Sequence, residues 1–269
     1  MCRWAAYRGT PIPLEQLVSA PGHSLIEQSQ QATQAKTATN GDGFGIAWYG
    51  EHPEPGLYRD VLPAWSDCNL RSLARQIRSP LFLAHVRAST GGATSRDNCH
   101  PFVHGRWSFM HNGQIAGFER IRRPMEAALS DPLYSARHGT TDSELLFLLA
   151  LEFGLETDPA AAFAETIRFT LAEAGRAGLS PLVRFTSAFS DGETLYAIRY
   201  ATDAHAPTLY SAPMCGNGGH CLVSEPFHDP DTKWHEIPAG SFVTLTSSGM
   251  RSMRFDPMQA EMARVAEVA

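Results

Sequence analysis

Four places in the chain carry residues that together could hydrolyse an amide, and the first of them is Cys2. Removal of Met1 would leave a thiol and a free α-amine on this one residue. An α-amine titrates at about pH 8, so part of it can act as a base at neutral pH. We therefore expect Cys2 to supply a nucleophile and its base together, with a chance cysteine at the N-terminus as the alternative explanation.

The other three places supply the remaining needs of such a reaction. Asn112 can donate a side-chain N–H, and Gly113 a backbone N–H, to the oxyanion that forms when a thiolate attacks an amide. Arg87 can hold a carboxylate through paired hydrogen bonds, and Asp142 can hold an ammonium group. Each residue alone has an ordinary structural explanation. Because an amino acid carries both charges, the set predicts a site for an amino acid whose side chain ends in an amide.

The composition is that of a globular protein, and it excludes several classes of function. The 269 residues are 43% hydrophobic and 19% charged, with a net charge of −6, which suits one domain over residues 1–269. Nucleic acid is not expected as a partner, because the chain is not basic. No apolar run is long enough for a membrane span, and the N-terminus lacks the pattern of a signal peptide. We expect a cytoplasmic protein that acts on a small molecule and does not bind membranes.

The five cysteines predict neither disulfides nor a metal site. Their number is odd, and a reducing compartment does not favour disulfides. Cys215 and Cys221 flank a glycine-rich stretch, but their spacing fits no standard zinc pattern. We expect no cofactor and no metal ion. A hydrolase that pairs Cys99 or Cys221 with a nearby histidine is an alternative, although neither cysteine sits at a clear helix start that would favour a thiolate.

Stretches typical of strands and of helices follow one another in an order that favours an α+β fold with mainly antiparallel sheets. Helices are expected at residues 13–20, 24–35, 69–78, 141–149 and 158–175, and after 257. Strands are expected at residues 44–49, 81–86, 106–110, 182–189, 194–200, 208–211, 220–224, 242–246 and 251–255. These ranges place Arg87 directly after a strand and Asp142 at the start of a helix.

Three short signals set expectations for local structure around these residues. Asn112-Gly113 follows an expected strand and predicts a tight turn. Thr141, with Glu144 three residues later, predicts a capping box at a helix start. Gly41, Gly43 and Gly45 lead into a strand rather than a helix, so they favour close backbone packing over phosphate binding.

Six short stretches resemble the glutaminase domain of class-II glutamine amidotransferases, which belong to the N-terminal-nucleophile (Ntn) hydrolases. They are Met1-Cys2-Arg3, Gly41-Asp42-Gly43-Phe44-Gly45, Ala84-His85-Val86-Arg87-Ala88-Ser89-Thr90, Asn98-Cys99-His100-Pro101, His111-Asn112-Gly113 and Thr141-Asp142-Ser143-Glu144. Each is short, but the ordered set is specific. Residues 223–226 and 234–240 resemble the end of the small stand-alone members, so the resemblance spans nearly the whole chain. It implies a four-layer αββα sandwich.

The resemblance implies that Cys2 is the nucleophile and that its α-amine is the base, acting through a water. Asn112 and Gly113 would form the oxyanion hole. Attack on the side-chain amide of glutamine, or on another γ-glutamyl amide, would give a γ-glutamyl thioester on Cys2. Water would then release glutamate, after ammonia or an amine has left.

The resemblance also implies how the substrate is held. Arg87 would bind the α-carboxylate with help from Thr90, and Asp142 would bind the α-amino group. His100 would support the site, with a buried structural histidine as an equal alternative. Gly91-Gly92 follows Thr90 where the larger synthases carry His-Gly, so one contact on the carboxylate side is expected to be missing.

The resemblance leaves the donor and the partner open. Glutamine as donor would imply a separate ammonia-accepting subunit, because no synthase domain is attached to this chain. Another γ-glutamyl donor would let the chain act alone, as the γ-glutamyl amidase of ergothioneine synthesis does. A regulatory or binding module of the same fold, acting with a partner synthase, is the alternative function. The intact set of candidate site residues argues against it.

Overall fold

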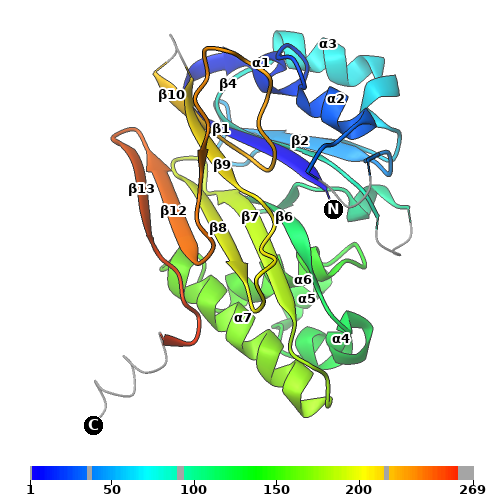
Figure 1. Cartoon of the computed structure of the whole chain (residues 1–269). Coiled ribbons are helices and arrows are strands. Elements are labelled where there is room, and N and C mark those ends of the chain that lie inside the picture. Colours follow the sequence, from blue (N-terminus) through cyan, green and yellow to red (C-terminus); the bar gives the residue numbers. More distant parts are fainter. Residues whose placement is uncertain (1, 35–37, 90–93, 215–217, 260–269) are drawn as a thin grey trace.

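The computed structural model describes residues 2–34, 38–89, 94–214 and 218–259 of the chain (Figure 1). The strands are β1 (Arg3–Pro13), β2 (Phe44–Trp48), β3 (Gly56–Asp60), β4 (Arg78–Val86), β5 (Phe102–His104), β6 (Trp107–Ile115), β7 (Val183–Ser190), β8 (Leu195–Ala201), β9 (Tyr210–Met214), β10 (Gly219–Val223), β11 (His235–Glu236), β12 (Ser241–Thr246) and β13 (Gly249–Arg254). The helices are α1 (Glu15–Val18), α2 (Leu25–Gln30), α3 (Cys68–Gln76), α4 (Phe118–Glu126), α5 (Asp131–Ser135), α6 (Asp142–Glu152) and α7 (Pro159–Arg176), with 3-10 turns η1 (Ala64–Ser66) and η2 (Arg96–Asn98). No described helix is both long and apolar enough to cross a membrane. The helix expected after residue 257 falls largely outside the described residues.

The described strands form two antiparallel sheets. The first has the strand order β11-β9-β10-β1-β4-β2-β3, and the second has the order β13-β12-β8-β7-β6-β5. Every pair of neighbouring strands in these two sheets is antiparallel. The α+β architecture with mainly antiparallel sheets is therefore confirmed.

Helices cover the outer face of each sheet, so the fold has four layers (Figure 1). Leu17, Ile26 and Leu70 bring α1, α2 and α3 onto the first sheet. A second apolar cluster joins α4, α6 and α7 to the other sheet. A third cluster, which includes Trp4 and Met110, lies between the two sheets. The order helix, sheet, sheet, helix confirms the expected αββα sandwich.

β1 lies inside the first sheet and brings the start of the chain to the end of β4. Arg3 pairs with Val86 in the antiparallel register. Cys2, one residue earlier, therefore lies beside the segment that follows β4, and its sulfur contacts Ala88. The first residues of a chain fray unless they are tied down, and here strand pairing on both sides of β1 holds them.

β1 has no counterpart among the elements expected from the sequence. Gly9 and Pro11 interrupt its pattern, and both fall between Arg8 and Ile12, where the register with β4 shifts. Such irregularities are where a strand accommodates residues that pair poorly. β3, β5, β11, α4 and α5 were also not expected from the sequence.

Two expected helices are shorter in the structure. The helix expected at residues 13–20 begins only at Glu15, because residue 13 still belongs to β1. The helix expected at residues 24–35 ends at Gln30. The backbone N–H groups of Thr33 and Gln34 donate to the Glu225 carboxylate instead of continuing the helix.

The tight turn predicted at Asn112-Gly113 is wrong, because β6 continues through Ile115. Residues 108–115 of β6 pair with residues 190–183 of β7. Asn-Gly favours a turn only as a local preference, and a long hydrogen-bonded partner strand overrides it. Both residues therefore sit on a rigid strand rather than on a loop.

Close packing at Gly43 and Gly45 is confirmed. A Cβ at Gly45 would collide with the carbonyl oxygen of His100, and one at Gly43 would collide with the sulfur of Cys99. Gly43 also has a φ of 114°, a conformation that side chains disfavour. These glycines let the segment containing Cys99 and His100 lie directly against β2.

Tyr49 joins the end of β2 to the second sheet through its hydroxyl group. This oxygen lies 2.9 Å from the carbonyl oxygens of Arg106 and Ser190 and 2.9 Å from Oγ of Ser108. Tyr49 is 4% exposed, so these groups have little access to water in its place.

Tyr49→Phe is expected to lower the free energy of unfolding by about 1–3 kcal/mol, because it removes a buried donor and leaves acceptors unpaired. The measurement is the midpoint of urea unfolding for the variant and the wild type. Tyr134→Phe is the matched control, since Tyr134 is 54% exposed on α5. Equal midpoints for the two variants would contradict a role for Tyr49 in joining the sheets.

Candidate active site

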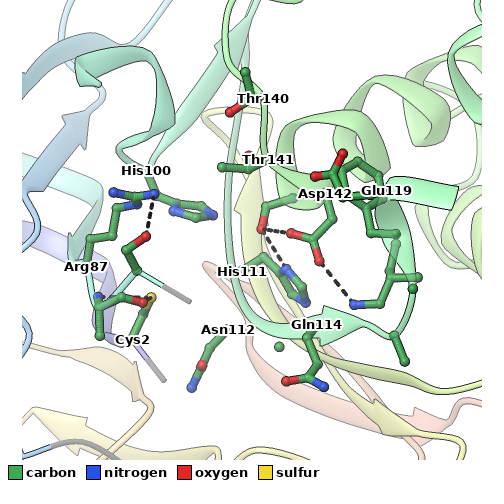
Figure 2. A pocket seen from close by; sticks show the side chains of 18 residues that line it. Cys2, Arg87, His100, His111, Asn112, Gln114, Glu119, Thr140, Thr141 and Asp142 are labelled. Atoms are coloured by element: carbon green, nitrogen blue, oxygen red, sulfur yellow. Dashed lines mark hydrogen bonds between the residues drawn. The ribbon is translucent and has the colours of Figure 1, made fainter. Parts of the chain in front are cut away.

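A pocket of about 620 Å³ opens where the start of β1, the end of β4, β6 and the start of α6 meet (Figure 2). Its lining includes Cys2, Arg87, His100, Asn112, Gly113 and Asp142. Thr90 lies outside the described residues. The fold therefore brings together every predicted site residue that the structure describes.

Cys2 forms one wall of the pocket and is partly buried. Its Sγ lies 3.5 Å from the backbone nitrogen of Ala88 and 3.6 Å from the carbonyl oxygen of the same residue. Cys2 directly precedes β1 of the first sheet, Asn112 lies in β6 of the second, and both line the pocket in Figure 2. The thiol is held by the backbone and remains accessible to a ligand in the pocket.

Asn112 brings an unsatisfied N–H donor to this pocket. The residue is 1% exposed, and its Nδ2 has no hydrogen-bond partner within the described part of the chain. A buried donor without a partner costs about 1–3 kcal/mol. A negatively charged oxygen in the pocket would satisfy this donor, which is what an oxyanion hole requires.

The backbone N–H of Gly113 points away from β7, towards an edge of β6 that no described strand covers at this point. Ala116 donates its N–H to Leu182, on the β7 side. Ile115 instead donates to Oδ2 of Asp142 at 3.1 Å, on the opposite side. N–H groups alternate between the two sides of a strand, so Gly113 has the same direction as Ile115. β5 pairs with β6 only up to Phe109 and leaves this edge uncovered further along.

Position 113 has no room for a side chain. A Cβ there would collide with the carbonyl oxygen of Arg184 and with the ring of His111. The His111 ring reaches across this position, and its Nε2 lies 3.3 Å from the Arg184 carbonyl oxygen. Glycine at 113 thus permits the close approach of β7 and the placement of His111.

Arg87 is held at the pocket by the segment that precedes β2. Its Nη1 donates to the carbonyl oxygen of Asp42 and its Nη2 donates to Oγ of Ser89, both at 3.3 Å. The Asp42 carboxylate accepts the N–H of Ser89 at 2.7 Å. Arg87 is 95% buried, and a buried planar fork of N–H donors suits a carboxylate ligand.

Asp142 is the first residue of α6 and follows the helix cap. Thr141 Oγ1 accepts the N–H of Glu144 at 3.2 Å, which confirms Thr141 as the N-cap. The Glu144 carboxylate differs from a standard capping box, because it accepts the N–H groups of His138 and Gly139 at 3.0 and 2.7 Å. A helix N-terminus stabilises a negative charge, so Asp142 is well placed as a carboxylate for a cation.

His100 lines the pocket and is 96% buried, which fits either a supporting role in the site or a structural one. Its ring lies 4.2 Å from the ring of His85, centroid to centroid. Neither ring has a hydrogen-bond partner among residues 2–34, 38–89, 94–214 and 218–259. Burial lowers the pKa of His85 to about 3 and that of His100 well below its usual range. Both rings are therefore neutral at physiological pH.

Cys99 and Cys221 do not form an alternative nucleophilic site. Both are fully buried, and burial raises the pKa of the Cys99 thiol and raises that of Cys221 to about 12. A thiol with a raised pKa is a poor nucleophile. Neither lines the pocket that contains Cys2.

Comparison with known proteins decides the family. The model of class-II glutamine amidotransferases matches residues 22–214, which is most of the chain. This chain belongs to the class-II glutamine amidotransferases. The solved structure of a glutamine aminotransferase class-II domain protein from Silicibacter pomeroyi is 43% identical, with a TM-score of 0.78 over 95% of this chain and 100% of that chain.

This amidotransferase matches one curated relative over part of that relative's length and another over nearly all of its length. A probable glutamine amidotransferase of Saccharomyces cerevisiae is 41% identical over 56% of this chain and 45% of its own length. The chain thus spans less than half of that relative. A γ-glutamyl-hercynylcysteine sulfoxide hydrolase of Mycolicibacterium smegmatis is 30% identical over 88% of this chain and 92% of its own length.

Three residues to which the sequence analysis assigned no role also belong to the site of this amidotransferase. Asp42 holds both the Arg87 side chain and the backbone of Ser89. His111 and Ser143 lie beside Asn112 and Asp142 in sequence and line the same pocket. The alternation of side chains along β6 could have placed His111 on the face opposite Asn112, but no sequence signal shows that it meets Ser143.

Proposed function

We propose that this amidotransferase is an amidohydrolase that cleaves γ-glutamyl amides, glutamine among them, through Cys2. The proposal rests on one observation above all: Asn112, whose buried Nδ2 has no hydrogen-bond partner among the described residues, lines the same pocket as the Cys2 thiol. Residues 1–269 form one proposed domain, and Met1 would be removed from it before the enzyme acts. A nucleophile opposite a buried, unpaired donor is the pairing that acyl transfer needs.

In the first step, the α-amine of Cys2 takes the thiol proton through a water, and Sγ attacks the side-chain carbonyl carbon of the substrate. The negative charge that develops on the carbonyl oxygen is stabilised by Asn112 Nδ2 and the N–H of Gly113. The α-ammonium of Cys2 then returns its proton to the leaving nitrogen as the C–N bond breaks. Ammonia or an amine leaves, and a γ-glutamyl thioester remains on Sγ.

In the second step, a water attacks the thioester carbon with the α-amine of Cys2 as its base. The same two N–H donors stabilise the second oxyanion. The C–S bond breaks, the sulfur takes up a proton, and glutamate is released. No metal ion or cofactor is needed to balance either step.

The charged groups at the other end of the pocket would select the glutamyl part. Arg87 would hold the α-carboxylate, with Thr90 as a proposed second contact, and Asp142 would hold the α-ammonium. His100 is neutral, so it could donate one hydrogen bond and accept another without adding charge to the site.

The leaving group is the part of the substrate that these contacts leave open. The pocket volume of about 620 Å³ lies within the range of sites that bind drug-sized molecules. A glutamyl group with an organic amine attached would therefore fit. The Mycolicibacterium smegmatis relative is named for a γ-glutamyl substrate. We favour such an amide as donor, whereas glutamine would call for a separate subunit that accepts ammonia.

The test measures glutamate and amine release from L-glutamine and from L-γ-glutamyl anilide by the tag-free protein. Intact mass first establishes that Met1 is absent. We expect glutamate and amine in equal amounts from at least one substrate. Acetylation of the substrate α-amine removes the group assigned to Asp142, and we expect it to raise KM by at least about tenfold.

No glutamate from either substrate, with Met1 absent, would contradict the hydrolase. The regulatory or binding module of the same fold would then be the better account, and binding of L-glutamate by calorimetry would replace turnover as the assay. Equal KM values for the acetylated and free substrates would contradict the role of Asp142 alone.

A further inference from the structure

A chain of close polar contacts connects β6 to the carboxylate of Asp142. Nδ1 of His111 lies 2.9 Å from Oγ of Ser143, and this Oγ lies 3.3 Å from Oδ1 of Asp142. On the other side of the ring, Nε2 of His111 lies 3.3 Å from the carbonyl oxygen of Arg184. His111, Ser143 and Asp142 all line the pocket, and Figure 2 labels the first and the last of them.

Two protons, one on the His111 ring and one on the Ser143 hydroxyl, serve three contacts, because the Arg184 carbonyl oxygen and the Asp142 carboxylate can only accept. With the ring proton on Nε2, His111 donates to the partly buried Arg184 carbonyl oxygen. The ring is 98% buried and packs 4.8 Å from the ring of Phe185, centroid to centroid. This burial lowers the pKa of His111 against the opposing effect of Asp142, so the ring is neutral at physiological pH and its Nδ1 is an acceptor.

Ser143 is then the donor to His111. A hydroxyl group has one proton, so it cannot also donate to Oδ1 of Asp142. The described residues offer Oδ1 no other hydrogen-bond donor, whereas Oδ2 already accepts the N–H of Ile115 at 3.1 Å. One oxygen of the carboxylate is thus engaged by the protein, and the other is left for a ligand.

We propose that His111 is a positioning residue that draws the Ser143 proton away from Asp142 and thereby keeps Oδ1 open for the substrate ammonium. This inference rests on the proposed function, in which Asp142 binds that ammonium. Without an acceptor at position 111, the Ser143 hydroxyl would turn to Oδ1 and compete with the substrate. The effect is on binding, because this end of the substrate keeps its charge throughout the reaction.

The test is a double-mutant cycle on KM for the substrate that the wild type turns over best. His111→Phe removes the acceptor, and we expect KM to rise about tenfold with a much smaller change in kcat. His111→Asn keeps an acceptor oxygen near the position of Nδ1 and is expected to stay close to the wild type. Adding Ser143→Ala to His111→Phe removes the competing hydroxyl and is expected to restore most of the lost affinity.

A KM that does not recover in the double mutant would overturn the inference, because a merely structural defect at position 111 is not repaired by a second deletion. If His111→Phe fails to fold, ¹⁵N NMR of the wild-type imidazoles decides the matter, with His111→Asn identifying the signal. We expect a proton on Nε2 and none on Nδ1. A proton on Nδ1 would overturn the inference.

Asp142→Asn separates this inference from the function on which it rests. An active wild type whose KM rises in Asp142→Asn, but not in His111→Phe, would overturn the role of His111 and leave the function standing. A wild type without activity, or an Asp142→Asn variant with unchanged KM, would overturn the assigned ammonium site and this inference with it.

Discussion

Replacing Cys2 with alanine is expected to lower glutamate release by at least about 1,000-fold, because the variant cannot form the covalent thioester. The α-amine base remains in this variant, so the loss reports on the sulfur alone. Substrate binding is expected to persist, since Arg87 and Asp142 are unchanged. The measurement is kcat from glutamate release, with substrate affinity determined separately by calorimetry.

Cys68→Ala is the matched control for the Cys2 variant. Cys68 is an exposed cysteine at the start of α3, on the outer face of the first sheet. Its removal is expected to leave kcat within about twofold of the wild type. A Cys2→Ala variant that keeps a tenth of the wild-type rate would contradict thiol catalysis at Cys2.

Replacing Asn112 with alanine is expected to lower kcat by about 100- to 1,000-fold with little change in KM. The carbonyl oxygen becomes fully charged only during the reaction, so a donor aimed at it acts mainly on the transition state. The variant also removes a buried, unpaired N–H, and its stability should not fall by the amount usual for a lost buried hydrogen bond. Steady-state kinetics and the thermal unfolding midpoint measure the two effects together.

A rise in KM with an unchanged kcat would contradict the oxyanion role of Asn112, since it would mean that the side chain binds the ground state. A large fall in the unfolding midpoint would show that Nδ2 has a partner in the folded protein. Either result would leave Gly113 as the better-supported donor, because the neighbouring strand does not cover its edge of β6.

The places of Arg87 and Asp142 in the fold were predictable because the local signals around them survive in the structure. Arg87 follows a buried strand, and Asp142 starts a capped helix, as their flanking sequences predict. The approach of Cys2 to Asn112 depends on two sheets packing face to face, which no local pattern encodes. Only the resemblance to a family with this architecture supplied that part of the prediction.

Errors in the sequence-based account arose where tertiary pairing overrode local preference. Asn112-Gly113 has the composition of a turn, yet β7 pairs with it as a strand. β1 contains two residues that weaken strands, and pairing with both β4 and β10 still holds it in the sheet. The meeting of His111 with Ser143 joins β6 to α6, and such contacts between distant elements follow from packing rather than from sequence pattern.

The most direct measurement of the central claim is covalent trapping of the nucleophile. A glutamine analogue with a chloromethyl ketone in place of its side-chain amide would be incubated with the wild type, and the labelled peptide would be identified by mass spectrometry. We predict one label per chain, on the sulfur of Cys2, in protein that lacks Met1, with protection by excess L-glutamate. A label on another cysteine, or none on Cys2 in protein without Met1, would contradict the account.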